Sequence, residues 1–343
     1  MKKLFVYALA VGMFTACSQD ETIEMQSPMQ ISFEGAYVGN ATRAAEDPSF
    51  HNTSNPLKAF DVWGFMSEAT GKVFVDEDVK KGDDDKWTYE NTQYWTPDRT
   101  YYFAALAPME SKNVTEAIAD GEDAKYGLGT ITFTNEKGKE DLLYAATTVT
   151  TGSSITKPEP VKFEFSHLLS KVKFSFTNAF KNSNAYIKVT NIKMDVPKTA
   201  KINLAQADWW STNKWCDYEN STTLYFGNME DEKVSINKST ECQFERLTFP
   251  TTDKIYTVTF YVELYYGDIL AYSSSLSTTI KNVVLEMGKA YNFHAKINPE
   301  NIVPGDGADD KLYPIEFTAS VKEWEDGNGY NGGDISTGSV PQN

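Results

Sequence analysis

The residues that could do chemistry are few in this chain of 343 residues. Of its three histidines, His51 lies in a polar stretch, while His167 and His294 lie inside alternating apolar runs, where packing is the usual role. No Gly-x-Ser-x-Gly, His-Glu-x-x-His or P-loop motif occurs, and no acid and base stand out among the many carboxylates. The sequence therefore predicts a protein that is not an enzyme, and a surface hydrolase is the weakest alternative.

Metal and cofactor sites are equally poorly supported. The acidic runs Val75–Lys86 and Gly305–Asp310 could suggest calcium. In the first run, however, Lys80 and Lys81 occupy the fifth and sixth positions of a calcium loop, where a ligand and a glycine are needed. We expect solvated loops at both places, with no metal and no cofactor.

The first cysteine has a different context. The stretch "MKKLFVYALAVGMFTAC" has two lysines, an apolar run and two small residues before Cys17, which is the layout of a secretory signal. A cysteine at this place resembles a bacterial lipobox, in which the thiol carries diacylglycerol. The alternative is an ordinary secreted protein with a chance cysteine. The following "SQDE" resembles an acidic tag for export to the cell surface, so we expect a lipid-anchored, surface-exposed protein of the cell outer membrane.

Cys216 and Cys242 remain, and in an oxidising compartment they can form one disulfide, although the sequence does not show whether they pair.

Trp209, Trp210 and Trp215 lie close together in a stretch with no clear strand pattern. Exposed tryptophans can stack on sugars or anchor a protein partner, whereas buried ones hold a loop onto a core. Both interpretations of this cluster stay open.

Short alternating runs separated by Gly, Asp, Asn, Lys and Pro clusters predict an all-β fold of two tandem β-sandwich domains. The plausible helix in the first half covers Glu110–Ala124. A composition break at Thr151–Pro160 is the best domain boundary, with one long loop as the alternative. A first strand is predicted with Ile31, Phe33 and Tyr37 on one face and Gly35 permitting a bulge. The last strand is predicted from the alternation of four residues: Ile315, Phe317, Ala319 and Val321.

Arginine is rare in this chain. Of 32 basic residues only Arg43, Arg99 and Arg246 are arginines, and Arg43 lies in the polar segment "GNATRAAED" after the first strand. Together with the lipobox, the order of "QYWTPDRTYYFAALAP", "FEFSHLLSKVKFSFTN" and "FTASVKEWEDG" resembles the fimbrillin (type V pilin) family of surface lipoproteins, over about residues 1 to 335.

The resemblance implies transthyretin-like sandwiches, no enzymatic activity and a lipid-anchored precursor. An arginine-specific protease would cut between Arg43 and Ala44, which would release the acyl anchor and the first strand. Subunits would then assemble into fimbriae by strand exchange and serve adhesion. The division implied is a signal peptide (1–16), an acylated pro-segment with the first strand (17–43), two sandwich domains (44–155 and 156–326) and a flexible tail (327–343).

The chain departs from a stalk subunit near its end, because the stretch after Trp324 is rich in Gly and Asn and nearly lacks alternation. Either the predicted last strand is itself the donor strand, or the chain is a tip or accessory subunit that accepts a strand and gives none. We favour a tip or accessory subunit, because Ile315–Val321 has the pattern of an ordinary core strand. The partners expected are other fimbrial subunits, with a host or bacterial surface protein or glycan as a further partner. The alternative function is a permanently lipid-anchored, glycan-binding β-sandwich protein. Nucleic acid is excluded as a partner by the net charge of −16.

Overall fold

The computed structural model describes residues 29–38, 56–67, 72–118, 128–155, 158–205, 215–303, 315–323 and 334–336. Within these ranges nearly all regular structure is β-strand, and the helix that they contain is the short α2 (Pro299–Ile302). The prediction of an all-β fold is confirmed. No helix in the described ranges is long and apolar enough to span a lipid bilayer.

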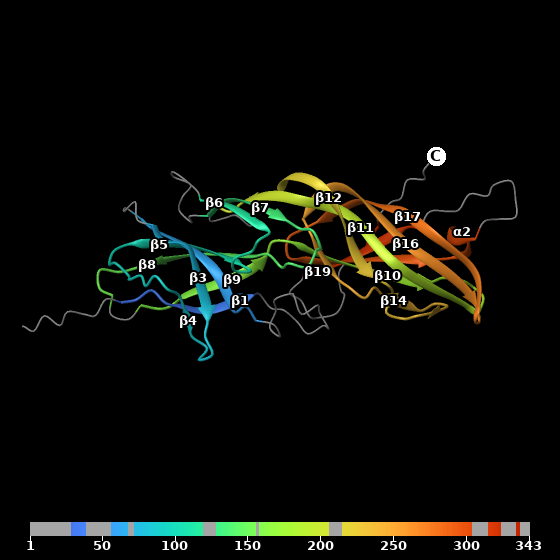
Figure 1. Cartoon of the computed structure of the whole chain (residues 1–343), viewed down its shortest axis with the longest axis horizontal. Helices are drawn as coiled ribbons and strands as arrows, with labels where there is room; N and C mark the ends of the chain where they lie inside the picture. The colour runs from blue at the N-terminus through green and yellow to red at the C-terminus, as the bar shows by residue number, and fades with distance from the viewer. Residues whose placement is uncertain are drawn as a thin grey trace, which may run out of the picture.

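The first sheet lies at one end of an elongated molecule (Figure 1). Its strands follow the order β1 (Phe33–Val38), β9 (Val161–His167), β8 (Leu143–Thr150), β5 (Thr100–Ala107), β2 (Ala59–Met66), β3 (Lys72–Lys81) and β4 (Trp87–Thr88). Neighbouring strands are antiparallel except β1 and β9, which are parallel.

The other described strands form two further sheets. One has the order β14 (Ser239–Glu241), β10 (Ser170–Asn178), β18 (Lys289–Ile297), β19 (Phe317–Glu323) and β20 (Asp334–Ser336), with β15 (Arg246–Thr248) also on β10. The other has the order β17 (Ile269–Leu285), β16 (Thr251–Tyr266), β11 (Ala185–Asn203), β7 (Leu128–Thr134) and β6 (Val114–Ile118), with β12 (Cys216–Gly227) and β13 (Val234–Ser235) also on β11.

The long strand β11 connects the two ends of the molecule, as its yellow-green ribbon in Figure 1 shows. Its first half pairs with β16, and its last residues pair with β7. Sheets therefore cross the boundary expected at residue 155, since β7 precedes that boundary and β9, which follows it, pairs with β8. The division into two tandem domains stays a prediction.

The first sheet is apolar on both faces. In β5, Phe103 and Ala105 join the cluster around Phe33, whereas Ala104 and Leu106 join a second cluster that includes residues of β7 and β11. A strand that is buried on both faces reads as a continuous apolar run, and this explains the sequence "FAALA" in β5. The third cluster fills the space between the other two sheets.

Two local expectations need correction. The helix expected at Glu110–Ala124 is wrong for the described part of that stretch, because Val114–Ile118 forms β6 and pairs antiparallel with β7. Pairing with a neighbouring strand overrides a weak helix propensity. The tail expected to be flexible contains β20, whose residues 334–336 pair with β19.

Candidate functional site

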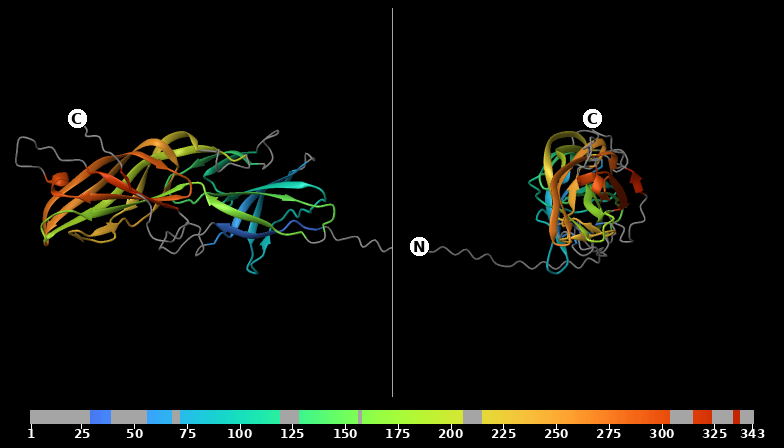
Figure 2. Two further views of the ribbon diagram at one scale, coloured as in Figure 1. Left: turned by 180° about the vertical axis from the view of Figure 1, so that it is seen from behind. Right: turned by 90° about the vertical axis from the view of Figure 1, so that its right-hand side faces the viewer.

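The segment Met29–Val38 closes the first sheet on itself. On one side Val161 N–H donates to the carbonyl of Ser32 (2.8 Å), and β1 runs parallel to β9. On the other side, Ile31 N–H donates to Gln93 O (2.8 Å) and Trp95 N–H donates to Met29 O (2.9 Å). The segment therefore fills the gap between β9 and the loop that follows β4. Figures 1 and 2 both show β1, in blue, along the lower margin of this sheet.

The strand carries one extra residue relative to its partner. Glu34 lies opposite Lys162 and Tyr37 opposite Glu164, so three steps along β1 match two along β9. This is the bulge that Gly35 led us to expect. Pairing with β9 is regular on both sides of the bulge, at Phe33 and Glu34 before it and at Tyr37 and Val38 after it.

Phe33 inserts into a pocket of aromatic rings. It stacks on Phe163 (centroids 6.0 Å apart, 17° between planes) and meets Phe60 edge-to-face (5.9 Å, 85°). Tyr89 approaches it at 5.6 Å, also edge-to-face, and Phe74 lies at 5.8 Å. Such ring pairs add about 0.5–1.5 kcal/mol each to the effect of burial. Phe33 is thus a central contributor to the apolar cluster of this sheet.

Ile31 is also fully buried, and Phe33 is only 6% exposed. Burial of two large apolar side chains stabilises the folded state by about 3–6 kcal/mol. Ser32 between them is half-buried and Glu34 is exposed, so the alternation predicted for the first strand holds at these four positions. The side chain of Tyr37 lies outside the described part of the structure.

Polar groups fix the loop opposite β9. The Tyr89 hydroxyl donates to Ile31 O (2.6 Å) and accepts from Gln93 N–H (3.3 Å). Burial raises the pKa of Tyr89, so its hydroxyl keeps its proton at neutral pH. The Glu77 carboxylate accepts from Glu90 N–H (3.0 Å), Asn91 N–H (3.0 Å) and Asn91 Nδ2 (2.6 Å). These bonds hold the loop in the position in which it pairs with the first segment.

This arrangement can bind a β-strand. Without residues 29–38, β9 and the loop at Gln93–Trp95 would each expose unpaired backbone groups, and the pocket around Phe33 would open to water. An unpaired edge beside an apolar groove is a template for a strand of another chain. The site therefore provides backbone hydrogen bonds on two sides and apolar pockets beneath.

Comparison with known families decides the assignment. A model described as fimbrillin-like matches residues 42–324. The chain belongs to the fimbrillin-like family. Members of this family are structural rather than catalytic, so this chain is not an enzyme.

A solved structure shows the same fold for this fimbrillin-like protein. It is similar to a fimbrial protein from Bacteroides vulgatus, with 18% identity, 77% of this chain and 92% of that chain covered, and a TM-score of 0.52. It is also similar to a fimbrial assembly protein from Parabacteroides distasonis, with 11% identity, 86% and 95% coverage, and a TM-score of 0.44. A comparison with curated proteins gave no match.

Several predicted site residues of this fimbrillin-like protein lie outside the described residues: Cys17, Arg43, Ala44, Trp209 and Trp210. Trp215 is described, and ligand contact at this residue is wrong. It is 4% exposed, its Nε1 donates to Leu168 O (2.7 Å), and its ring packs on Phe249 (4.8 Å). A buried indole with its only donor used has no surface to offer a sugar.

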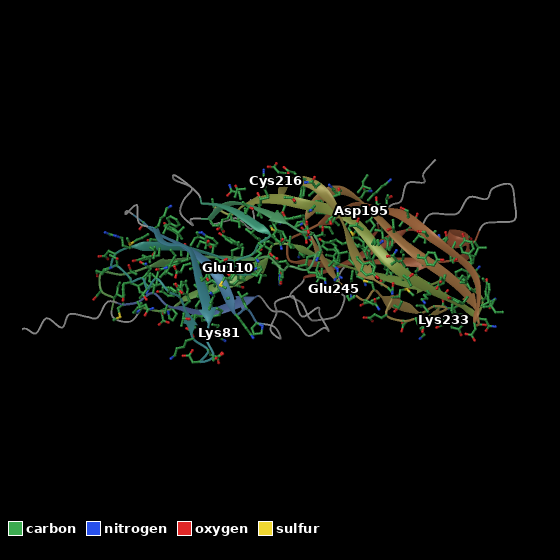
Figure 3. All side chains as sticks on the ribbon, in the orientation of Figure 1. Lys81, Glu110, Asp195, Cys216, Lys233 and Glu245 are labelled. Carbon is green, nitrogen blue, oxygen red and sulfur yellow. The ribbon has the colours of Figure 1, made fainter. Side chains whose placement is uncertain are left out.

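The disulfide considered between Cys216 and Cys242 does not form in the structure, where both thiols are free. Cys216 is exposed on β12, at the upper margin of Figure 3, and Cys242 is buried. The Cys242 thiol accepts from Phe174 N–H (3.2 Å) and donates to Phe244 O (3.2 Å). Burial raises the pKa of Cys242 to about 11, so this thiol is neutral and unreactive at neutral pH.

The predicted last strand is β19, preceded by Ile315. Ile315, Phe317 and Ala319 are buried and Val321 is half-buried, so the four residues share the core-facing side as expected. Antiparallel neighbours lie on both sides, β18 on one and β20 on the other. In this structure β19 is an interior strand of its own sheet.

The described histidines serve packing and local hydrogen bonds. His167 Nδ1 lies 2.8 Å from Asp141 Oδ1, with both side chains buried. His294 lies 2.9 Å from Ser175 Oγ and 3.1 Å from Thr177 Oγ1. Among the described residues, no group of three or more His, Cys, Asp and Glu could hold a metal ion.

The residues that bind the first segment on the side opposite β9 were not predicted from the sequence. Tyr89, Gln93 and Trp95 bind the first segment on this side, and Glu77 holds the intervening turn at Glu90 and Asn91. The signal that could have found them is the density of aromatic residues in "KWTYENTQYW".

Proposed function

We propose that this chain is a fimbrial subunit whose first strand is removed before assembly. Water would hydrolyse the Arg43–Ala44 peptide bond, leaving a carboxylate on Arg43 and an amino group on Ala44. The acylated residues 17–43 would then be held only by non-covalent contacts. Their departure would open the groove between β9 and Gln93–Trp95 to a strand from another subunit.

The observation that carries this proposal is the burial of Ile31 and Phe33 in a segment that lies before Arg43. A segment that only tethered a lipid would not need two core side chains and hydrogen bonds on both edges. The family match begins at residue 42, so β1 lies before the matched region. Membership of the family supports a cell-surface location and association with other fimbrial subunits.

The other two arginines are poor protease sites. Arg246 is 4% exposed and its guanidinium lies 4.7 Å from the centre of the Phe244 ring. Arg99 is half-buried, and its backbone N–H is bound by Thr151 Oγ1 (3.0 Å). Proteases need an extended and accessible segment, so these contacts favour cleavage at Arg43.

A tip or accessory position is supported by β19. Strand β19 is paired on both sides and has Phe317 and Ala319 in the core, so its donation would open the sheet that holds it. Unlike β1, it lies after the proposed cut and would stay covalently part of the mature subunit. The proposed subunit therefore accepts a strand and keeps its own last strand.

The test is an assembly assay on the precursor. We expect that an arginine-specific protease will convert the purified precursor into larger species on a native gel, and that Arg43→Ala will stay monomeric. Arg99→Lys is the matched control and should assemble like the wild type. Equal assembly by Arg43→Ala would overturn the proposal.

The alternative, a glycan-binding protein that stays on its lipid anchor, has less support. Its sequence basis was the tryptophan cluster, and Trp215 is a core residue. Of this cluster, Trp209 and Trp210 alone would have to provide the contact with a glycan.

A further inference from the structure

After residues 17–43 leave, the groove would keep a pocket shaped to the side chain of Phe33. Its five ring neighbours come from five places in the first sheet: Phe60 in β2, Phe74 in β3, Tyr89 after β4, Phe103 in β5 and Phe163 in β9. One ring stacks on Phe33, and the planes of three others stand at 75–85° to it. Their arrangement matches a flat ring better than a branched aliphatic side chain.

The walls of this pocket are held by partners other than Phe33. Phe60 packs on Trp87 (5.1 Å) and Phe165 (5.6 Å). Phe103 packs on Trp95 (6.0 Å) and Tyr101 (5.9 Å). Because these contacts are made without Phe33, its removal would leave a cavity that the walls cannot easily fill. Cavities in close-packed cores are strongly unfavourable.

The backbone contacts also fix a direction. The groove has one parallel edge (β9) and one antiparallel edge (Gln93–Trp95). Tyr89 Oη donates to the carbonyl of Ile31, and Gln93 O accepts from the N–H of the same residue. A strand entering in the opposite direction would exchange the parallel and antiparallel edges and displace both groups from these partners.

From these contacts we infer that the groove selects its incoming strand by an aromatic side chain at the Phe33 position. An aliphatic residue lies two positions earlier, and the strand runs parallel to β9. This inference rests on the proposed function. The occupant is therefore a subunit strand with the pattern aliphatic-x-aromatic. A strand with alternating aliphatic residues alone is a poor ligand.

The test keeps the protein constant and varies the strand. The precursor is cut at Arg43, freed of residues 17–43 by gel filtration in mild denaturant, and returned to buffer. Binding of a fluorescent peptide with the sequence of residues 29–38 is measured by polarisation, with unlabelled variants as competitors. The variants are Phe33→Ala, Phe33→Leu, Phe33→Tyr and, as the exposed control, Glu34→Ala.

We expect Phe33→Ala to weaken binding about 100-fold and Phe33→Leu about 10-fold, while Phe33→Tyr retains most of the affinity. Glu34→Ala should bind within about threefold of the native peptide, because Glu34 is exposed. A second measurement uses Tyr89→Phe in the protein, which should weaken all peptides by the same factor, since it removes the hydroxyl's bonds to Ile31 O and Gln93 N–H and keeps the ring.

The outcomes separate the two claims. If the native, Phe33→Ala and Phe33→Leu peptides all bind equally well, the inferred selectivity is overturned, while the proposal that the groove binds a strand is retained. If the native peptide fails to bind the processed protein, the proposed function itself is contradicted.

Discussion

Asp61 lies in surroundings that disfavour its negative charge. It is buried in β2; its Oδ2 accepts from Glu110 N–H (2.9 Å), while Oδ1 has no hydrogen-bond partner among the described residues. Burial, followed by the negative charges of Asp76, Asp78 and Glu116, raises the pKa of Asp61 to about 7, and the bond from Glu110 opposes this only in part. Figure 3 labels Glu110 in this region.

This shift predicts a pH dependence. In the unfolded chain the pKa of an aspartate is close to 3.8. The folded protein therefore favours the protonated form, and the stability this provides is present below pH 4 and is lost as the pH rises to 7. We expect Asp61→Asn to raise the free energy of unfolding by about 2 kcal/mol at pH 8 and by little at pH 4. Urea unfolding at the two pH values checks this, and a gain that is the same at both would contradict it.

Trp215 offers a second test at the scale of one residue. Trp215→Phe should lower the free energy of unfolding by about 1–3 kcal/mol, because it leaves the Leu168 carbonyl without its buried donor. Tyr225→Phe is the control, since Tyr225 is exposed. Thermal unfolding of the two variants measures the difference. A wild-type stability for Trp215→Phe would show that the indole hydrogen bond does not contribute.

At the scale of the strand, β1 should behave as part of the folded core before cleavage. Phe33→Ala in the uncut precursor should lower the free energy of unfolding by about 3–5 kcal/mol, because it removes a buried ring from a close-packed cluster. Glu34→Ala should change it by less than about 0.5 kcal/mol. Urea unfolding of both variants is the measurement, and similar small effects would show that β1 is not integral to the core.

The elements that the sequence predicts well are those with a strict alternation. Ile31 and Phe33 in the first segment, and Ile315, Phe317 and Ala319 in the last, face the core as expected. The loop Gln93–Trp95 could not be predicted, because its role depends on a partner about sixty residues earlier and its own sequence has no alternation. β6 was mistaken for helix because Val114 and Ile118 fit both periods, and only the position of β7 decides between them.

At the scale of the whole molecule, the two ends are joined by more than β11. Asn135 Nδ2 donates to Leu247 O (2.8 Å), and Leu247 N–H donates to Gly138 O (2.8 Å), so the loop after β7 is bound to β15. Gly138 has a φ of +62°, and a Cβ there would lie 2.8 Å from Leu247 O. The joint between the ends is thus a close backbone contact that needs glycine.

This contact predicts that alanine substitutions at two glycines will differ strongly in their effect on thermal stability. Gly138→Ala should lower the midpoint of thermal unfolding by several degrees, about 1–3 kcal/mol, because of both the positive φ and the clash. Gly152→Ala should have little effect, since a Cβ there meets nothing within 4 Å. Equal effects of the two substitutions would mean that the contact with Leu247 does not hold the ends together.

The central claim is that the first strand leaves when the subunit assembles, and the most direct measurement is the N-terminus of assembled protein recovered from cells. Edman sequencing with mass spectrometry should give a start at Ala44, with no peptide containing Ile31 and Phe33 in the fibres. A blocked, acylated start at Cys17 in assembled material, with the peptide of residues 29–38 still present, would contradict the claim.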